Sequence, residues 1–282
     1  MYYWRGRTLS PAAQMKRLPA SGSAIVYVDF DQLRRGGIFD LFASGKSVED
    51  DDYRKFAQST HLDWRKDLDS AMVSFAPSGK YMLVRGRFDW TSLQSYARQS
   101  GGDCEGDTCR MPGSVPERRI SFFPMSRGLM ALAVSTDDLA AKRMIGETPG
   151  PEPQVPAAPI WIRIPGSVLK TAEDLPSGTR MFARTVGSAD TVTLLFEPEG
   201  NRLAGRLEVV CQNDQDAAAM AAELTKVTTL LREMIEREQQ KPNAGDFSGV
   251  LTSGTFSAQG RRVVGHWPIE RSFVQNVLGG AN

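Results

Sequence analysis

Residues 148–159 read Thr-Pro-Gly-Pro-Glu-Pro-Gln-Val-Pro-Ala-Ala-Pro, and this stretch decides how the rest of the chain is divided. It contains five prolines in twelve residues. Proline fixes its φ angle and lacks a backbone N–H, so we expect a stiff, extended linker rather than a helix or a central strand. The 282 residues are enough for two domains. We therefore predict a first lobe over 22–147 and a second over 160–282, with residues 1–21 as an N-terminal tail.

The first lobe alternates apolar runs with short polar turns. Runs rich in β-branched and aromatic residues predict strands, and the Pro77-Ser78-Gly79-Lys80 turn predicts a hairpin. Asp89 is expected to cap a helix in which apolar residues share one face. The expected elements are strands at 24–30, 71–76, 81–88, 120–124 and 129–134, and helices at 31–42, 52–60, 90–100 and 137–145.

The second lobe shows the same order of elements, with one much longer helix. The pattern predicts strands at 160–164, 191–197, 203–211, 250–256 and 262–267, and a terminal helix at 270–278. Between them, Asn213 or Asp214 is expected to cap a helix that runs to about residue 240. Its apolar side chains recur at spacings of three and four, which predicts one stripe facing a sheet: Ala217, Met220, Ala221, Leu224, Val227, Leu231, Met234 and Ile235.

These patterns predict an α+β fold. Each lobe is expected to be a mainly antiparallel sheet with helices on one face. Because both lobes repeat the order of strands, hairpins and helices, we also predict an internal duplication.

Composition excludes some classes of function. Lys and Arg number 34 and Asp and Glu 33, giving a formal net charge of +1. A duplex nucleic-acid binder normally has a clear basic excess, so we expect no nucleic-acid partner. No apolar run reaches the roughly 20 residues that cross a bilayer, and no signal peptide is recognisable at the start.

The first seven residues, Met-Tyr-Tyr-Trp-Arg-Gly-Arg, leave the compartment open. Adjacent aromatics followed by arginines are typical of the interfacial end of a membrane helix. One interpretation is therefore a membrane tether through a segment preceding Met1, which would make the protein extracytoplasmic, in the periplasm or on the cell surface. The other is an exposed tail on a cytoplasmic protein.

Three cysteines are too few for a disulfide scaffold. Cys104 and Cys109 flank a short loop that resembles a hairpin, and cross-strand neighbours approach disulfide geometry. A disulfide is the first interpretation, with free thiols or a metal or redox use as alternatives. A disulfide would favour an oxidising compartment. Cys211 ends a strand-like run and is expected to be a buried apolar residue.

The nearest approach to a catalytic motif is Asp29-Phe30-Asp31, at the end of an apolar strand. Haloacid-dehalogenase-type phosphatases place a nucleophile, a general acid and Mg²⁺ at such a pair, and residues 24–31 resemble that start. The family's Gly-Thr continuation is replaced by Gln32-Leu33, and its distal acidic pair is missing. One carboxylate pair holds Mg²⁺ poorly, because octahedral coordination needs further oxygen ligands. The alternative is structural: Asp31 caps a helix and Asp29 ends a strand.

Several short phrases resemble a known group of proteins. They are RLPA at 17–20, IVYVD at 25–29, LR at 33–34, LDWRKDLD at 62–69 and RGRFD at 85–89. They are similar to uncharacterised bacterial extracytoplasmic proteins with tandem α+β repeats. The resemblance implies a location and an architecture, and it brings no known reaction, cofactor or functional residue.

We therefore expect a non-catalytic binding or interaction module that is exported, with a protein or a small molecule as partner and no cofactor or metal. Two alternatives stay open. One is a Mg²⁺-dependent phosphohydrolase that uses Asp29 and Asp31. The other is a structural component of a cell-envelope assembly, which would expose a large apolar patch.

Overall fold

The computed structural model describes residues 9–39, 51–170, 175 and 177–279. The chain divides into two compact units, the first made of residues 1–31 and 48–157 and the second of 32–47 and 158–282. The boundary at residue 157 lies inside the proline-rich stretch. The division differs from the expected 22–147 and 160–282 in two respects: the first unit also takes in the expected tail and most of the linker, and the described residues 32–39 belong to the second unit.

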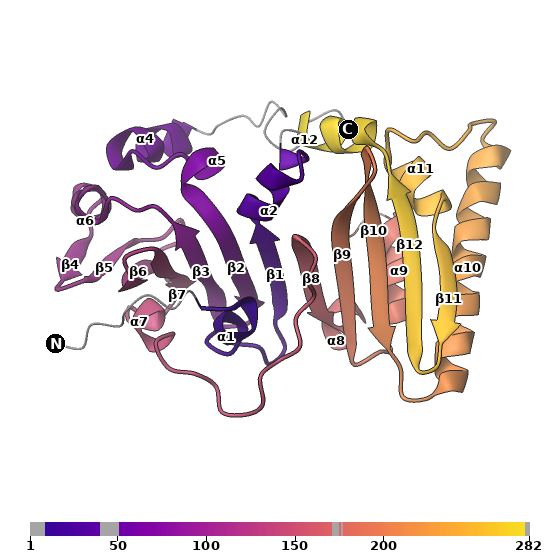
Figure 1. The fold of residues 1–282 in the computed structure, drawn as a ribbon, viewed down its shortest axis with the longest axis horizontal. Helices are drawn as coiled ribbons and strands as arrows, with labels where there is room; N and C mark the ends of the chain where they lie inside the picture. Colours follow the sequence, from indigo (N-terminus) through magenta and orange to yellow (C-terminus); the bar gives the residue numbers. More distant parts are fainter. Residues whose placement is uncertain (1–8, 40–50, 171–174, 176, 280–282) are drawn as a thin grey trace. The chain divides into compact units, whose positions relative to one another are not determined.

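The first unit contains a fully antiparallel sheet with the strand order β1-β2-β3-β7-β6-β5-β4 (Figure 1). The strands alternate in burial because successive side chains point to opposite faces. They are β1 (Ala24–Asp29), β2 (Leu68–Ala76), β3 (Gly79–Gly86), β4 (Asp103–Glu105), β5 (Thr108–Pro112), β6 (Arg119–Ser126) and β7 (Leu129–Ser135).

The second unit contains a sheet with the order β8-β9-β10-β12-β11, again antiparallel. Its strands are β8 (Ile160–Pro165), β9 (Thr191–Glu199), β10 (Arg202–Val210), β11 (Thr255–Gln259) and β12 (Arg262–Ile269).

The two sheets share one connectivity. In both, the first three strands are neighbours in order, and the last strand lies beside the third. The first unit adds the short β4–β5 hairpin at its edge. Strands β1, β2, β3, β7 and β6 therefore correspond to β8, β9, β10, β12 and β11. This match agrees with the predicted duplication, which stays a prediction because a strand order alone does not establish common descent.

In the second unit, helices cover one face of the sheet. The long helix α10 runs alongside β11 and β12 (Figure 1), with Asn213 as its cap. Residues of its predicted stripe from Ala217 to Val227 are buried, whereas Met234 is exposed. The helices are α8 (Gly166–Lys170), α9 (Ser177–Val186), α10 (Asp214–Arg237), α11 (Phe247–Thr252) and α12 (Arg271–Gly279).

In the first unit, helices lie on both faces of the sheet, unlike the single face expected. Phe122 packs in the cluster that contains α6 residues, whereas the adjacent Ser121 accepts a hydrogen bond from the backbone of α7. Neighbouring residues of a strand point to opposite faces, so α6 and α7 lie on opposite sides. The helices are α1 (Pro11–Met15), α2 (Phe30–Arg35, ending in the second unit), α4 (Asp51–Thr60), α5 (Trp64–Asp67), α6 (Trp90–Gln99) and α7 (Ala140–Arg143).

Part of the expected tail and linker is folded. Ser10 caps α1, and Leu18 is buried. Arg17 pairs with Glu147 at 2.7 Å, and the backbone N–H of Thr148 donates to the carbonyl of Lys16 at 2.7 Å. The start of the proline-rich stretch is therefore held against the segment around α1. The aromatic opening of the chain, residues 1–7, lies outside the described residues.

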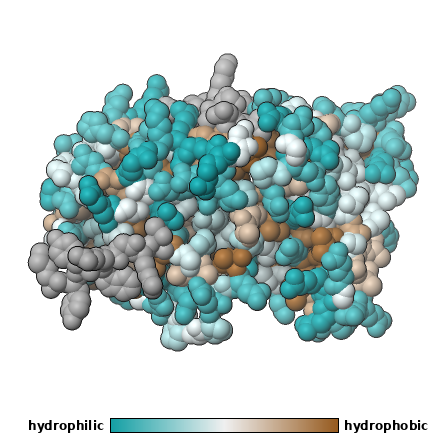
Figure 2. All heavy atoms as spheres, viewed as in Figure 1, coloured by the Kyte–Doolittle hydropathy of each residue, from teal (hydrophilic) through white to brown (hydrophobic). Residues whose placement is uncertain are grey.

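The α+β class predicted from the sequence is confirmed by these two antiparallel sheets and their helices. Figure 2 shows that hydrophilic residues predominate on the viewed surface, with smaller hydrophobic areas among them. Within the described ranges, no helix is both long and apolar enough to span a membrane.

Candidate functional site

Asp29 lies at the end of β1 in a polar row that crosses the first sheet. It is directly opposite Ser70 of β2, and Ser70 is directly opposite Arg85 of β3. Directly opposed residues have side chains on the same face of a sheet. The carboxylate and the guanidinium group therefore lie on the same face, with a hydroxyl between them.

The second sheet has a row at the corresponding position. Arg163 of β8 is opposite Thr193 of β9, which is opposite Glu208 of β10. The hydroxyl again stands in the middle, but the acid and the base have exchanged strands. We call these two sets of three residues the charged rows.

An aromatic residue stands two positions before the first member of each charged row. The Tyr27 hydroxyl donates to Oδ2 of Asp29 at 3.3 Å. In the second unit, the Arg163 guanidinium carbon lies 5.8 Å from the centre of the Trp161 ring. Both aromatic side chains are buried. Each row is thus built into the fold beside a core residue.

Burial shifts the pKa of one side chain beside or within each charged row, Tyr27 in the first unit and Arg163 in the second. Desolvation, together with the Asp29 carboxylate, raises the pKa of Tyr27 to about 12. Burial also lowers the pKa of Arg163, and the nearby Glu208 opposes this shift. Tyr27 therefore stays a neutral hydrogen-bond donor to Asp29 at neutral pH.

Asp29 and Asp31 belong to no group of metal-binding side chains among the described residues. Asp31 lies in the first turn of α2, where a carboxylate interacts favourably with the helix dipole, rather than at the cap position before the helix. Among the described residues, no group of three or more His, Cys, Asp or Glu side chains could hold a metal ion.

The face of the second sheet opposite α10 carries a network of exposed ion pairs. Glu199 lies 3.0 Å from Nε2 of His266 and 2.9 Å from Arg202. Arg206 pairs with Glu197 at 3.6 Å. Hydrogen bonds from His266 and Arg202 lower the pKa of Glu199. These charges satisfy one another within the chain, so the face resembles a solvated surface more than a vacant binding site.

A shallow depression of about 480 Å³ lies at the turn between α4 and α5. His61 there adopts φ of +56°, a region that residues other than glycine rarely occupy. Asp63 caps α5; partial burial would raise the pKa of Asp63, but hydrogen bonds from Lys66 and from the Arg65 backbone lower it. The only carboxylate among the lining residues is therefore already engaged. The lining consists of Tyr53, Ala57, Gln58, His61, Leu62, Asp63 and Arg65.

The first sheet leaves a row of apolar side chains partly open on the face that carries α6. Phe75 is 44% exposed, and Val73, Met82, Val134 and Ile120 are half-buried. Cross-strand pairing places them together: Val73 is opposite Met82, and Val134 is opposite Ile120. We call Val73, Phe75, Met82, Val134 and Ile120 the apolar strip.

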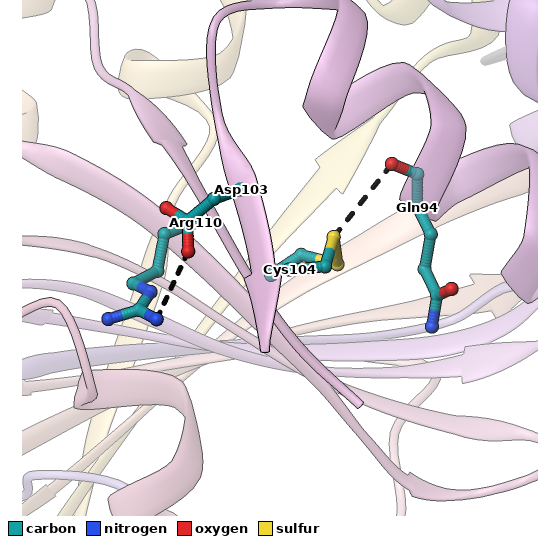
Figure 3. Close-up of a disulfide and its surroundings, with 5 residues drawn as sticks. Gln94, Asp103, Cys104 and Arg110 are labelled. Atoms are coloured by element: carbon teal, nitrogen blue, oxygen red, sulfur yellow. Dashed lines mark hydrogen bonds and ion pairs between the residues drawn. A yellow bond between two sulfur atoms is a disulfide. The ribbon is translucent and has the colours of Figure 1, made fainter. Parts of the chain in front are cut away.

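Cys104 and Cys109 form a disulfide between β4 and β5 (Figure 3). They are directly opposed across the hairpin, as the short loop suggested. Cys109 is fully buried in the cluster beneath α6, and the backbone carbonyl of Gln94 in that helix lies 3.8 Å from Sγ of Cys104. On the other side of the hairpin, Arg110 pairs with Asp103 at 3.1 Å. The disulfide therefore fastens the hairpin to the core, and Cys211 is a buried free thiol.

The charged rows and the apolar strip were not recognised in the sequence. Each row draws its members from three strands, so only the register joins them. The strip shows in the sequence as ordinary strand alternation, and its exposure depends on which helix covers it. The signal that was available is that Asp29 and Arg163 each follow an aromatic residue by two positions near the end of the first strand of a lobe.

No family model and no curated protein matches the chain. Among solved structures, crystal form I of TP0453, a Treponema protein, matches with a TM-score of 0.52 at 10% sequence identity, over 97% of this chain and 100% of that chain. Crystal form III of the same protein matches with a TM-score of 0.52 at 9% identity, over 94% and 97%. At such low identity these likenesses show the fold alone.

Proposed function

We propose that the chain is a non-catalytic protein-interaction module and that the apolar strip of the first unit is its binding surface. The observation that carries the proposal is the partial exposure of adjacent apolar side chains on several strands of one sheet. Contiguous exposed apolar surface in a folded protein commonly marks an interaction site.

The second unit supplies the comparison. By strand order and register, Val134 corresponds to Ile269, and Lys80 corresponds to Leu203. Ile269 is 5% exposed and Leu203 is 3% exposed. Val134 is half-buried and Lys80 is exposed. The position that is core in one unit is therefore surface in the other, which is expected if the first unit keeps it for a partner.

The phosphohydrolase alternative receives no support from the geometry. Asp29 is accounted for by Tyr27 and by its row with Arg85, and Asp31 by the first turn of α2. Assay of the purified protein against phosphatase and esterase substrates with Mg²⁺ tests this directly. Turnover that Asp29→Asn abolishes would overturn the non-catalytic assignment.

Site-specific photo-crosslinking tests the proposed surface. We would replace Phe75 by benzoyl-phenylalanine, since both are exposed aromatic side chains, and irradiate the protein in its native host. The matched control carries the same group at Leu139, which is 41% exposed and lies beside α7, on the opposite face of the sheet. We expect a discrete crosslinked protein from position 75 and none from 139. Equal crosslinking at both positions would contradict the proposal.

We also propose that the protein is exported. The support is the Cys104–Cys109 disulfide, because disulfides persist mainly in oxidising compartments. Its test is alkylation of the protein taken from cells under acid quench, before and after reduction. One free thiol before reduction and three after would support export, whereas three from the start would oppose it. A structural role in an envelope assembly would use the same strip, and a fixed stoichiometry of the crosslinked product would indicate it.

The internal duplication belongs to the same proposal. It is supported by the shared strand order and by charged rows at corresponding registers. Under this proposal, one copy has kept its helical cover and the other has become the binding unit.

A further inference from the structure

The last strand of the second sheet, β11, has an open outer edge. It is terminal in the strand order and pairs with β12 alone (Figure 1). Within the described part of the chain, no backbone hydrogen bond joins β11 to any other segment. Helix α10 packs on the face that carries Phe256, yet every residue of the strand except the half-buried Phe256 is exposed. Backbone groups along this edge therefore face solvent.

The register shows which backbone groups point outward. The β11–β12 hairpin closes with Gln259 directly opposite Arg262, across a two-residue turn. The residues that flank such a turn are hydrogen-bonded to each other, and bonded and non-bonded pairs alternate along antiparallel strands. Gln259 and Ser257 therefore direct their backbone groups toward β12. Phe256 and Ala258 direct theirs outward, as two N–H donors and two C=O acceptors.

The neighbouring β9–β10 hairpin gives the same phase independently. Glu199 is opposite Arg202 across another two-residue turn, so the even-numbered residues of β10 bond to β9. The odd-numbered residues face β12, where Leu207 is opposite Gly265. This leaves the even-numbered residues of β12 for β11, in agreement with the assignment from the turn.

Strand β11 lacks the features that usually protect an edge. Residues 255–259 read Thr-Phe-Ser-Ala-Gln, without a charge, a proline or a bulge. The strand at the other end of the strand order, β4, has only three residues. Its Asp103 and Glu105 are both charged, and they pair with Arg110 at 3.1 and 3.0 Å. Strand β4 is therefore a protected edge, whereas β11 is open to pairing with another strand.

We infer that β11 pairs with β11 of a second copy of the chain, antiparallel, with the two Ser257 residues directly opposite each other. In this register Phe256 of each copy is opposite Ala258 of the other. Both outward N–H groups and both outward C=O groups of each strand then find partners, which is the argument for a second copy. The two sheets become one continuous sheet across a two-fold axis.

The side chains fit the same register. The small methyl group of Ala258 leaves room beside the Phe256 ring, and no charged residue of one strand opposes another. Just beyond the paired residues, Gly254 of one copy is opposite Gly260 of the other, so no side chain obstructs the ends. This surface is distinct from the apolar strip and adds self-association to the proposed function.

Cysteine crosslinking of the full-length protein tests the register. Opposed residues of a non-bonded pair lie about 4.5 Å apart at Cα, so Ser257→Cys should give a covalent dimer under mild oxidation. Gln259→Cys alone should not, because the two positions are then offset by four residues, about 14 Å along the strands. Mixing Gln259→Cys with Thr255→Cys should restore the dimer, since these positions are opposite each other. Non-reducing electrophoresis measures each product.

Sedimentation velocity tests the association itself. The wild-type chain should show a dimer whose fraction rises with concentration. Ala258→Pro should weaken the dimer by about tenfold or more, because proline removes an outward donor while leaving the bonds to β12 intact. Ser257→Lys should also weaken it, by placing two ammonium groups opposite each other. Circular dichroism confirms that both variants fold, and Phe75→Glu, in the apolar strip, should leave the dimer unchanged.

Four results would overturn the inference. The first is a wild-type chain that stays monomeric at every concentration. The second is equal crosslinking of Ser257→Cys and Gln259→Cys, and the third is association that survives both Ala258→Pro and Ser257→Lys. The fourth is association lost in Phe75→Glu and kept in Ala258→Pro, which would assign it to the apolar strip. The crosslinking experiment at position 75 in cells is separate, so the proposed function stands or fails without this dimer.

Discussion

The charged rows occupy corresponding positions in the sheets of the two units, but the acid and the base have exchanged strands. In the first unit the acid, Asp29, is on the first strand, and in the second unit the base, Arg163, is there. The middle residue is a hydroxyl in both. The common feature is an acid and a base two strands apart on one face, beside a buried aromatic residue, and the two units place the acid and the base on opposite strands. This teaches that Asp29 is explained by the fold, so its position after an apolar strand is no evidence of catalysis.

The helical covers differ far more than the rows do. The second sheet is covered by α9, α10 and α11 on one side, whereas the first has short helices on both sides and an apolar strip left partly open. The following experiments are designed to break or sharpen this contrast, from the largest expected effect to the smallest.

Removing a contact under the long helix should give the largest effect. Leu224 is fully buried where α10 meets the second sheet. Leu224→Ala should destabilise the second unit by about 3 kcal/mol, the usual cost of such a cavity. Hydrogen exchange resolved by mass spectrometry should show faster exchange in residues 158–279 and little change in the first unit.

The matched control lies on the same helix. Met234 is 48% exposed, so Met234→Ala should change stability by less than about 0.5 kcal/mol. Equal losses for the two variants would mean that α10 does not rest on the sheet as described.

Opening the disulfide should destabilise the first unit alone. The Cys104–Cys109 pair closes a short loop, so replacing both by alanine should cost about 2 kcal/mol in the chain-entropy account. Urea unfolding with and without reductant measures this. Cys211→Ala is the control, because that thiol forms no disulfide and its stability effect should not depend on reductant.

Exchanging the polarity of the first charged row tests the comparison itself. Asp29→Arg alone places two cations in one row and should cost about 1 kcal/mol or more, since like charges in a row repel. The double variant Asp29→Arg, Arg85→Glu reproduces the order found in the second unit and should recover most of that loss. A double variant as unstable as the sum of its single changes would show that the two rows are not equivalent.

The comparison also explains what could be predicted from the sequence. Strands, hairpins and the long helix follow from periodicity, because an alternation of two or a spacing of three and four fixes which side chains face the core. The linker follows from its prolines. The contacts of Thr148 and Glu147 with Lys16 and Arg17, however, show that the start of this stretch is bound to the segment around α1, far away in the sequence.

The apolar strip could not be predicted from the sequence for a related reason. Val73 and Phe75 look like any alternating strand, and the sequence does not show that Phe75 stays exposed while its neighbours on other strands are half-buried. Asp29 looked catalytic because the other members of its charged row, Ser70 and Arg85, lie on other strands. Single-sequence patterns report local periodicity, and both features depend on tertiary register.

Titration of Tyr27 distinguishes the two rows without mutation. Its pKa of about 12 means that the folded state holds the proton more tightly than the unfolded state, for which the value is about 10. The stabilisation is therefore fully present below pH 10 and is lost as the pH rises from 10 to about 12. Absorbance at 295 nm should show one tyrosine that ionises late. Asp29→Asn should lower its pKa, whereas the corresponding Trp161 has nothing to ionise.

The smallest effect is expected on the exposed face of the second sheet. Hydrogen bonds from His266 and Arg202 lower the pKa of Glu199, so the folded state favours the carboxylate. Its contribution is present above the usual carboxyl pKa and is lost as the pH falls through the lowered value. Because these groups are solvated, the change in stability should be near the limit of measurement, whereas NMR of the Glu199 side-chain carboxyl should resolve the shift. His266→Ala should move the midpoint upward, and an unmoved midpoint would show that the ion pair does not form in solution.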